Sequence, residues 1–154
     1  MSNQAAGTGE LSFTRIFDAP RDLVFRCMTD PDHLVHFWGP AGVSAPREHI
    51  TVDLRPGGGF ETVMINVADG SQYPTRALYT EVVPPERLAW REAHSGMTVT
   101  VTFADLGDRT QVHIHQAQVP EMALSPQAQA GFATSLDRFA AYVRTAHETA
   151  RSPR

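Results

Sequence analysis

The sequence predicts an α+β domain: a curved antiparallel sheet of six to seven strands around a long C-terminal helix, with two short helices after the first strand. Residues 49–119 show the alternating pattern of strands almost throughout, with turn residues between them. Residues 127–147 instead repeat apolar side chains at helical spacing. A chain of 154 residues, 42% of them hydrophobic, is large enough for one such domain, for which we expect residues 11–148.

The first strand and both short helices are expected before residue 40. Residues 11–17 alternate with an imperfect period of two. In residues 18–28, Asp18 can cap a helix and Pro20 lies in its first turn. The second helix begins at Asp30 and ends before a Gly-Pro pair, and its buried stripe is Leu34, Phe37 and Trp38.

The remaining strands are separated by glycine, proline and aspartate turns. The clearest pair is a hairpin over residues 97–119 that turns at Gly107 and Asp108. The earlier strand segments are residues 49–54, 60–67, 76–83 and 87–92.

The width of such a sheet predicts a cavity. Seven strands about 4.8 Å apart span about 34 Å, whereas one helix covers about 10–12 Å. The sheet must therefore curl around the helix, and incomplete filling leaves an apolar cavity, the natural place for function.

The side chains expected to face this cavity are the candidate ligand-binding residues. The polar candidates Thr62 and Gln116 could orient a ligand or satisfy a neighbouring polar group. Each apolar candidate could also be ordinary core. The apolar candidates are Phe37, Trp38, Phe60, Met64, Trp90, Val99, Val101, Phe103, Val112, Ile114, Phe132, Leu136 and Phe139.

Charge and composition exclude several classes of protein. All 13 basic residues are arginine and the net charge is −4, so we expect no nucleic-acid or membrane partner. The lack of lysine excludes a Walker A loop and a Schiff-base lysine. Residues 1–10 lack signal-peptide features and are expected to be disordered, and residues 149–154 to be a flexible tail. We expect a cytoplasmic protein.

Two histidine pairs could in principle bind a metal. His33 and His36 are three residues apart on a predicted helix, and His113 and His115 lie on one face of a strand. No supporting ligand pattern accompanies either pair, so we expect structural or solvent-facing histidines, no metal and no cofactor.

Catalytic candidates are weak. Tyr79 and Glu81 are expected to share one face of their strand, and the sequence leaves open whether that face is inward. A buried Glu81 without a partner could act as a general base. Cys27 lies on an apolar helical face, which favours packing over chemistry.

Five sequence blocks carry a family resemblance that runs from about residue 13 to residue 143. They are "FDAPRDLVFRCMTDPDHLVHFWGP", "VDLRPGGGFETVM", "YTEVVPPERLAW", "MTVTVTF" and "GFATSLDRFAAYV". Together they resemble the bacterial single-domain branch of the Hsp90 ATPase activator homologue family, within the START/Bet v 1-like superfamily.

The resemblance implies a helix-grip fold around a hydrophobic cavity that holds lipids, sterols or aromatic polyketides in many members. Phe37 and Phe132 stand where the family often has tryptophan, so a relative's ligand does not transfer. The eukaryotic co-chaperone engages Hsp90 through an additional N-terminal domain, so the family name is not taken to imply that interaction.

Three functions remain open at this point. The first is non-catalytic binding of a small hydrophobic or aromatic ligand, lipid, sterol or polyketide-like. The second is a cyclase, isomerase or hydrolase acting on such a ligand, with Glu81, Tyr79 or a histidine in acid-base roles. The third is an interaction module that docks a chaperone or a second copy of the chain through an exposed Trp38.

Overall fold

The structure, a computed structural model, describes residues 9–151 and contains one antiparallel sheet of eight strands. The sheet order is β1-β8-β7-β6-β5-β4-β2, and β3 pairs with β4. The predicted fold class is confirmed, with one strand more than the upper expected number. The strands are β1 (Gly9–Phe17), β2 (Val43–Ser44), β3 (Thr51–Val52), β4 (Gly59–Asn66), β5 (Gln72–Val83), β6 (Arg87–Glu92), β7 (Thr98–Asp105) and β8 (Thr110–Val119).

Three α-helices and two 3₁₀ turns complete the described chain. They are α1 (Arg21–Thr29), α2 (Pro31–Leu34), η1 (Arg47–His49), η2 (Glu121–Leu124) and α3 (Pro126–Arg151). None of these helices is long and apolar enough to cross a membrane.

Several expected boundaries were wrong. The second short helix is only four residues long, although hydrogen-bonded turns continue to Trp38 before Gly39 reverses the chain at φ +101°. In the segment expected as a strand at residues 49–54, only β3 (Thr51–Val52) pairs, His49 ends η1, and the other residues belong to no helix or strand. Gly9 and Glu10, expected to be disordered, belong to β1, and residues 149–151 belong to α3. Residues 1–8 and 152–154 lie outside the described residues.

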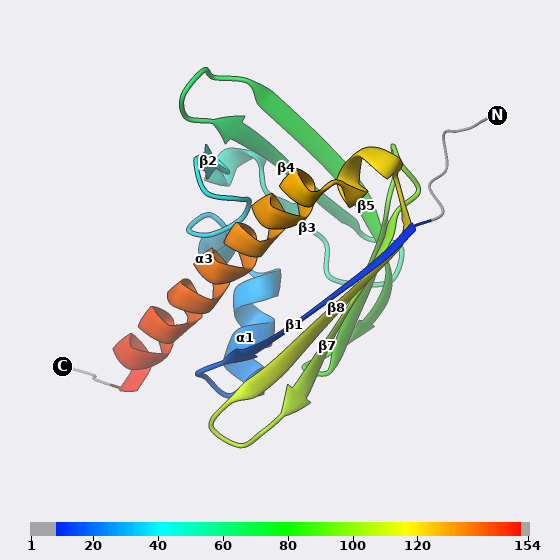
Figure 1. Cartoon of the computed structure of the whole chain (residues 1–154). Helices are drawn as coiled ribbons and strands as arrows, with labels where there is room; N and C mark the ends of the chain where they lie inside the picture. The colour runs from blue at the N-terminus through cyan, green and yellow to red at the C-terminus, as the bar shows by residue number, and fades with distance from the viewer. Residues whose placement is uncertain (1–8, 152–154) are drawn as a thin grey trace.

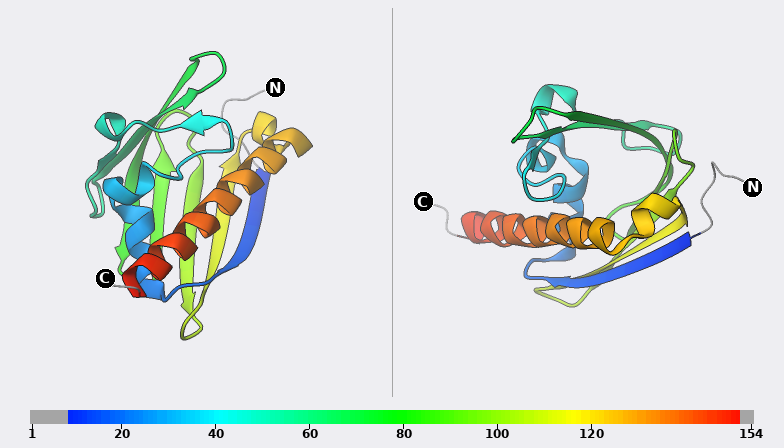
Figure 2. Two further views of the ribbon diagram at one scale, coloured as in Figure 1. Left: turned by 90° about the vertical axis from the view of Figure 1, so that its left-hand side faces the viewer. Right: turned by 45° about the horizontal axis from the view of Figure 1, so that its top comes forward.

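The sheet curves around α3, which crosses its concave side, while α1 closes one end (Figures 1 and 2). The half of α3 nearest the C-terminus is firmly packed. Phe139 stacks on Phe37 with ring centroids 4.5 Å apart and meets Phe17 edge-to-face at 4.6 Å. One turn further along, Val143 is fully buried. This end of the helix and the α1 region therefore form the solid part of the core.

A β-bulge separates Tyr79 from Glu81. The register of β5 against β6 shifts between these residues, so Thr80 is an extra residue on its strand. Tyr79 is only 2% exposed, whereas the side chain of Glu81 is 42% exposed. The expectation that the two side chains share a face was therefore wrong, because the bulge resets the alternation.

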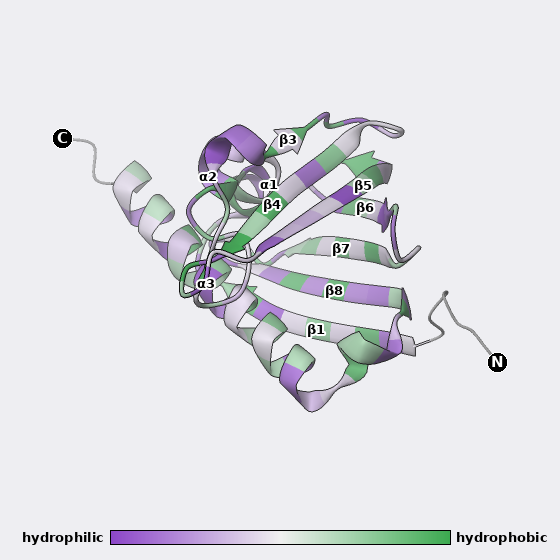
Figure 3. Ribbon diagram, turned by 90° about the horizontal axis from the view of Figure 1, so that it is seen from above, coloured by the Kyte–Doolittle hydropathy of each residue, from purple (hydrophilic) through white to green (hydrophobic). Residues whose placement is uncertain are grey.

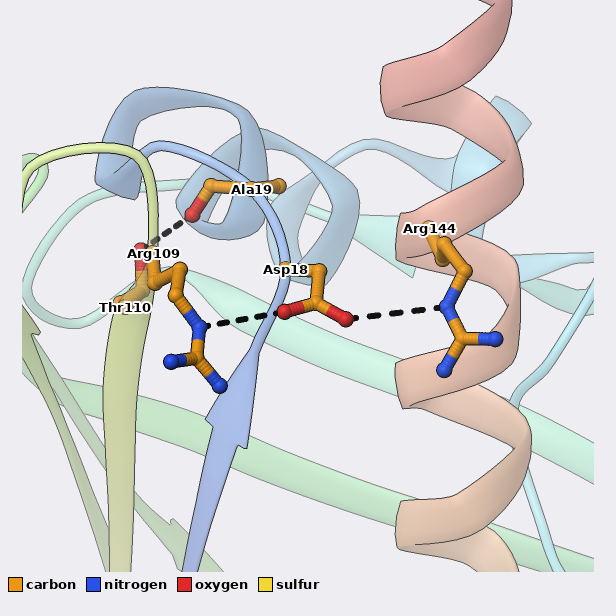
Figure 4. A network of polar contacts seen from close by, with 5 residues as sticks. All are labelled: Asp18, Ala19, Arg109, Thr110 and Arg144. Carbon is orange, nitrogen blue, oxygen red and sulfur yellow. Dashed lines mark hydrogen bonds and ion pairs between the residues drawn. The ribbon is translucent and has the colours of Figure 1, made fainter.

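The sequence suggested that Asp18 caps α1. In the structure Asp18 instead links the end of β1 to Arg109, before β8, and to Arg144 of α3. The residue at the N-cap is Pro20, without a side-chain cap. As Figure 4 shows, the Asp18 carboxylate pairs with Arg109 at 3.1 Å and with Arg144 of α3 at 3.8 Å. Beside it, the buried Thr110 hydroxyl donates to the Ala19 carbonyl oxygen over 2.7 Å.

Thr110→Val should destabilise the protein more than Asp18→Asn, although Asp18 has two arginine partners. Loss of the buried hydroxyl leaves the Ala19 carbonyl without this donor, which costs about 1–3 kcal/mol. The Asp18 pairs are more than half exposed, so their loss costs less than about 1 kcal/mol. Urea unfolding at pH 7 measures both changes, and the reverse order would contradict this ranking.

Candidate functional site

A cavity of about 450 Å³ lies between the sheet and the N-terminal half of α3. Figure 3 shows the strands of the sheet and α3 from above, coloured by the hydropathy of each residue. Most of the predicted ligand-binding residues line it: Phe37, Trp38, Phe60, Met64, Trp90, Val99, Val101, Ile114, Gln116, Phe132, Leu136 and Phe139.

Three predicted residues lie outside the cavity lining. Phe103 packs against Phe25 of α1, with ring centroids 5.3 Å apart, and Val112 is its cross-strand partner. Both are buried at the end of the sheet that α1 covers. The buried hydroxyl of Thr62 instead forms a 2.8 Å hydrogen bond with Thr75. The inward-facing side chains of β7 and β8 therefore line the cavity over part of each strand and belong to the solid core near α1.

The sequence analysis missed lining residues of two kinds. Small residues of α3 carry no hydrophobic signal, so Ala128, Gly131 and Ser135 were not recognised. Glu92 could have been found, because it continues the inward phase of Trp90 on β6. The other residues missed are Met28, Gly39, Pro40, Thr75, Ala77 and Met97.

Aromatic rings form one wall of the cavity. Phe60 meets Trp38 edge-to-face at 5.3 Å and Trp90 at 5.1 Å. Behind it, Tyr79 stacks on Phe60 at 5.6 Å. Such edge-to-face contacts fix the rings relative to one another, so the wall presents a rigid apolar surface.

Trp38 is half-buried, with an indole N–H that makes no hydrogen bond within residues 9–151. An unsatisfied buried donor costs about 1–3 kcal/mol. The ring is held in spite of this cost by its contact with Phe60. An interaction surface would instead require Trp38 to be largely exposed.

Four polar side chains reach the cavity: Thr75, Glu92, Gln116 and Ser135. Gln116 is 8% exposed. Burial raises the pKa of Glu92, and the Ser95 hydroxyl, 3.5 Å from its carboxylate, opposes this only in part. Among the described lining residues, Glu92 is the single side chain that carries a charge, and no arginine or histidine faces it across the cavity.

The residues considered earlier for catalysis lie elsewhere. Glu81 pairs with Arg87 over 2.7 Å, and Tyr79 lies behind Phe60, where burial raises its pKa. Burial also raises the pKa of the Cys27 thiol to about 11, which disfavours the reactive thiolate.

The histidines form structural contacts. Nδ1 of His33 lies 2.6 Å from the hydroxyl of Tyr142, and His36 stacks on the same ring. On the outer face of the sheet, His113 forms a hydrogen bond with Thr14 and His115 one with Glu10.

Comparison with known proteins decides the family. The model of the family described as Activator of Hsp90 ATPase homolog 1-like protein matches residues 18–144. The chain belongs to this AHSA1 family. The resemblance inferred from the five sequence blocks is therefore confirmed, and so is the helix-grip fold.

Solved structures of bacterial proteins resemble this AHSA1 family member over most of its length. Protein CV1439 from Chromobacterium violaceum is 27% identical, with a TM-score of 0.79, over 86% of this chain and 96% of its own. The AHSA1-like protein from Aeromonas hydrophila is 26% identical, with a TM-score of 0.77, over 90% of this chain and 94% of its own. No curated protein matches the sequence.

Glu92→Gln should stabilise the protein at neutral pH. Because burial raises the pKa of Glu92 in the folded state, its contribution to stability is full below the ordinary value of 4.5 and is lost as the pH rises through the folded pKa. The variant's advantage in melting temperature should therefore grow from pH 4 to pH 8. The exposed Glu86→Gln makes the same charge change outside the cavity and is the matched control. An advantage for Glu92→Gln that shrinks with rising pH would contradict the assignment.

Gly131→Ala should raise the free energy of unfolding by about 0.8–1 kcal/mol, which is the helix-propensity difference. A Cβ at Gly131 would meet no atom within 4 Å, so no clash opposes the gain. Ala130→Gly, at the exposed neighbouring position, should lower stability by a similar amount. Urea unfolding measures both, and destabilisation by Gly131→Ala would show that the space is not open.

Proposed function

We propose that the protein binds a small hydrophobic or aromatic molecule, of lipid, sterol or polyketide type, inside the cavity without transforming it. The observation that carries this proposal is an apolar cavity of about 450 Å³ with an aromatic wall. This volume is within the range of ligand pockets, which are mostly apolar with a few polar groups. Membership of the AHSA1 family, in a superfamily that commonly binds hydrophobic ligands, supports the same function.

The composition of α3 also supports a cavity that is kept open. Gly131 lies in the helix, where glycine costs about 0.8–1 kcal/mol relative to alanine, and it lines the cavity. Ala128 and Ser135 lie on the same side, three residues before and four residues after it. Larger side chains at these positions would fill the space, so the small residues preserve volume at a cost in stability.

Binding is favoured over catalysis by the chemistry of the lining. Acid-base catalysis on an apolar ligand ordinarily uses more than one titratable group, and Glu92 is the single one among the described lining residues. The hydroxyls of Thr75 and Ser135 have no histidine beside them in this lining to activate them as nucleophiles.

A ligand-dependent melting shift tests the proposal. Fatty acids, sterols, flavonoids and polycyclic aromatics are added separately to the protein, and tryptophan emission is followed on heating. A ligand at a hundredfold its Kd adds about 2.7 kcal/mol, which corresponds to roughly 5–11 °C for this size. A shift confined to one chemical class, with altered emission from Trp38 and Trp90, is the expected result.

Gly131→Leu should abolish that shift, because its side chain would occupy the cavity. Ala130→Leu places the same side chain at the exposed position beside it and should leave the shift unchanged. Circular dichroism shows whether both variants fold. Shifts retained in Gly131→Leu, or no shift with any class in the parent protein, would overturn the proposal.

A further inference from the structure

The cavity wall changes in polarity along the strands. Glu92 is the cross-strand partner of Ala77, which makes Thr75 its diagonal neighbour on the same face of β5. Both residues line the cavity near the turn between β6 and β7. The lining therefore has a carboxylate and a hydroxyl at this turn, and we call this its polar end, although the apolar Met97 of the turn also lines the cavity.

The opposite end of the lining is apolar. Val101 and Ile114 are cross-strand partners that lie two residues beyond Val99 and Gln116 toward α1. Both line the cavity, as does Phe139 of α3. Gln116 lies at the transition between the two ends. An amphipathic ligand would thus place its polar group toward Glu92 and its apolar body toward α1.

The polar end accepts hydrogen bonds and repels anions. An ionised carboxylate offers only acceptors, and Glu92 has one long contact, 3.5 Å from the Ser95 hydroxyl. Burial disfavours its charged form, so a hydrogen-bond donor on a ligand would relieve this cost. The carboxylate of a fatty acid would instead bring a second negative charge toward Glu92, with no cation in the described lining to offset it.

We propose that Glu92 selects the ligand, so that the cavity takes apolar molecules that carry an alcohol or phenol hydroxyl and rejects the corresponding carboxylates. This inference rests on the proposed function. It adds which polar group the ligand carries, a hydroxyl, and which residue recognises that group, Glu92. Thr75 and Gln116 provide further hydrogen-bonding groups close to the same end of the cavity.

The test uses three probes with one apolar body: naphthalene, 2-naphthol and 2-naphthoate. Their affinities are measured at pH 7 by quenching of tryptophan emission, since Trp38 and Trp90 line the cavity. The parent protein should bind 2-naphthol roughly tenfold more tightly than naphthalene, as expected for one hydrogen bond to a charged acceptor. It should bind 2-naphthoate roughly tenfold more weakly than naphthalene.

Two substitutions of Glu92 separate charge from hydrogen bonding. Glu92→Gln keeps an acceptor without the charge, so the rejection of 2-naphthoate should weaken while part of the preference for 2-naphthol remains. Glu92→Leu removes both, so the preference for 2-naphthol should be lost, while 2-naphthoate should gain affinity relative to naphthalene but stay the weaker ligand, because burial of an unpaired carboxylate remains costly. Glu86→Gln, an exposed residue between β5 and β6, makes the same charge change outside the cavity and should behave like the parent.

The outcomes distinguish this inference from the function on which it rests. If the parent protein binds all three probes equally, or if both Glu92 variants keep its preferences, the inference is overturned while ligand binding stands. If none of the probes binds, the proposed function fails for this class and the inference fails with it. Circular dichroism and melting curves confirm that each variant is folded before its affinities are compared.

Discussion

One helix cannot cover eight strands, and this mismatch shapes the whole protein. The sheet meets the constraint by curling around α3 (Figure 2), whose C-terminal half packs into the solid core. There Phe139 lies against Phe17 and Phe37, and Arg144 approaches Asp18 at the corner between β1 and α1. The N-terminal half of the same helix presents the small Ala128, Gly131 and Ser135 beside Phe132 and Leu136, and the unfilled volume is the cavity.

The cost of the cavity is distributed over several residues. Gly131 has a lower helix propensity than alanine would have at the same position. The indole N–H of Trp38 is buried without an acceptor among residues 9–151, and burial raises the pKa of Glu92. Features that lower stability in this way collect where a protein works, because a fully packed interior has no room for a ligand. The solid core under α1 supplies the stability that the cavity lacks.

Local patterns were sufficient for most of the architecture. Alternation placed the main strands, helical spacing placed α3, and the inward phase identified Gln116 and most of the aromatic lining. The errors have separate physical causes. The bulge at Thr80 inserts one residue into β5 and turns Glu81 away from Tyr79. Asp18 does not cap α1, because its carboxylate pairs with arginines that are distant in the sequence.

The sequence by itself determined the fold class and most of the inward-facing side chains, because these depend on periodicities along the chain, and it indicated the family through its five motif blocks. Only the tertiary structure decided which inward positions line a cavity and which belong to solid core. Phe103 and Val101 share one strand face, yet Phe103 lies against α1 and Val101 lines the cavity. The difference depends on where α1 and α3 end on the sheet, and packing between distant segments sets that position.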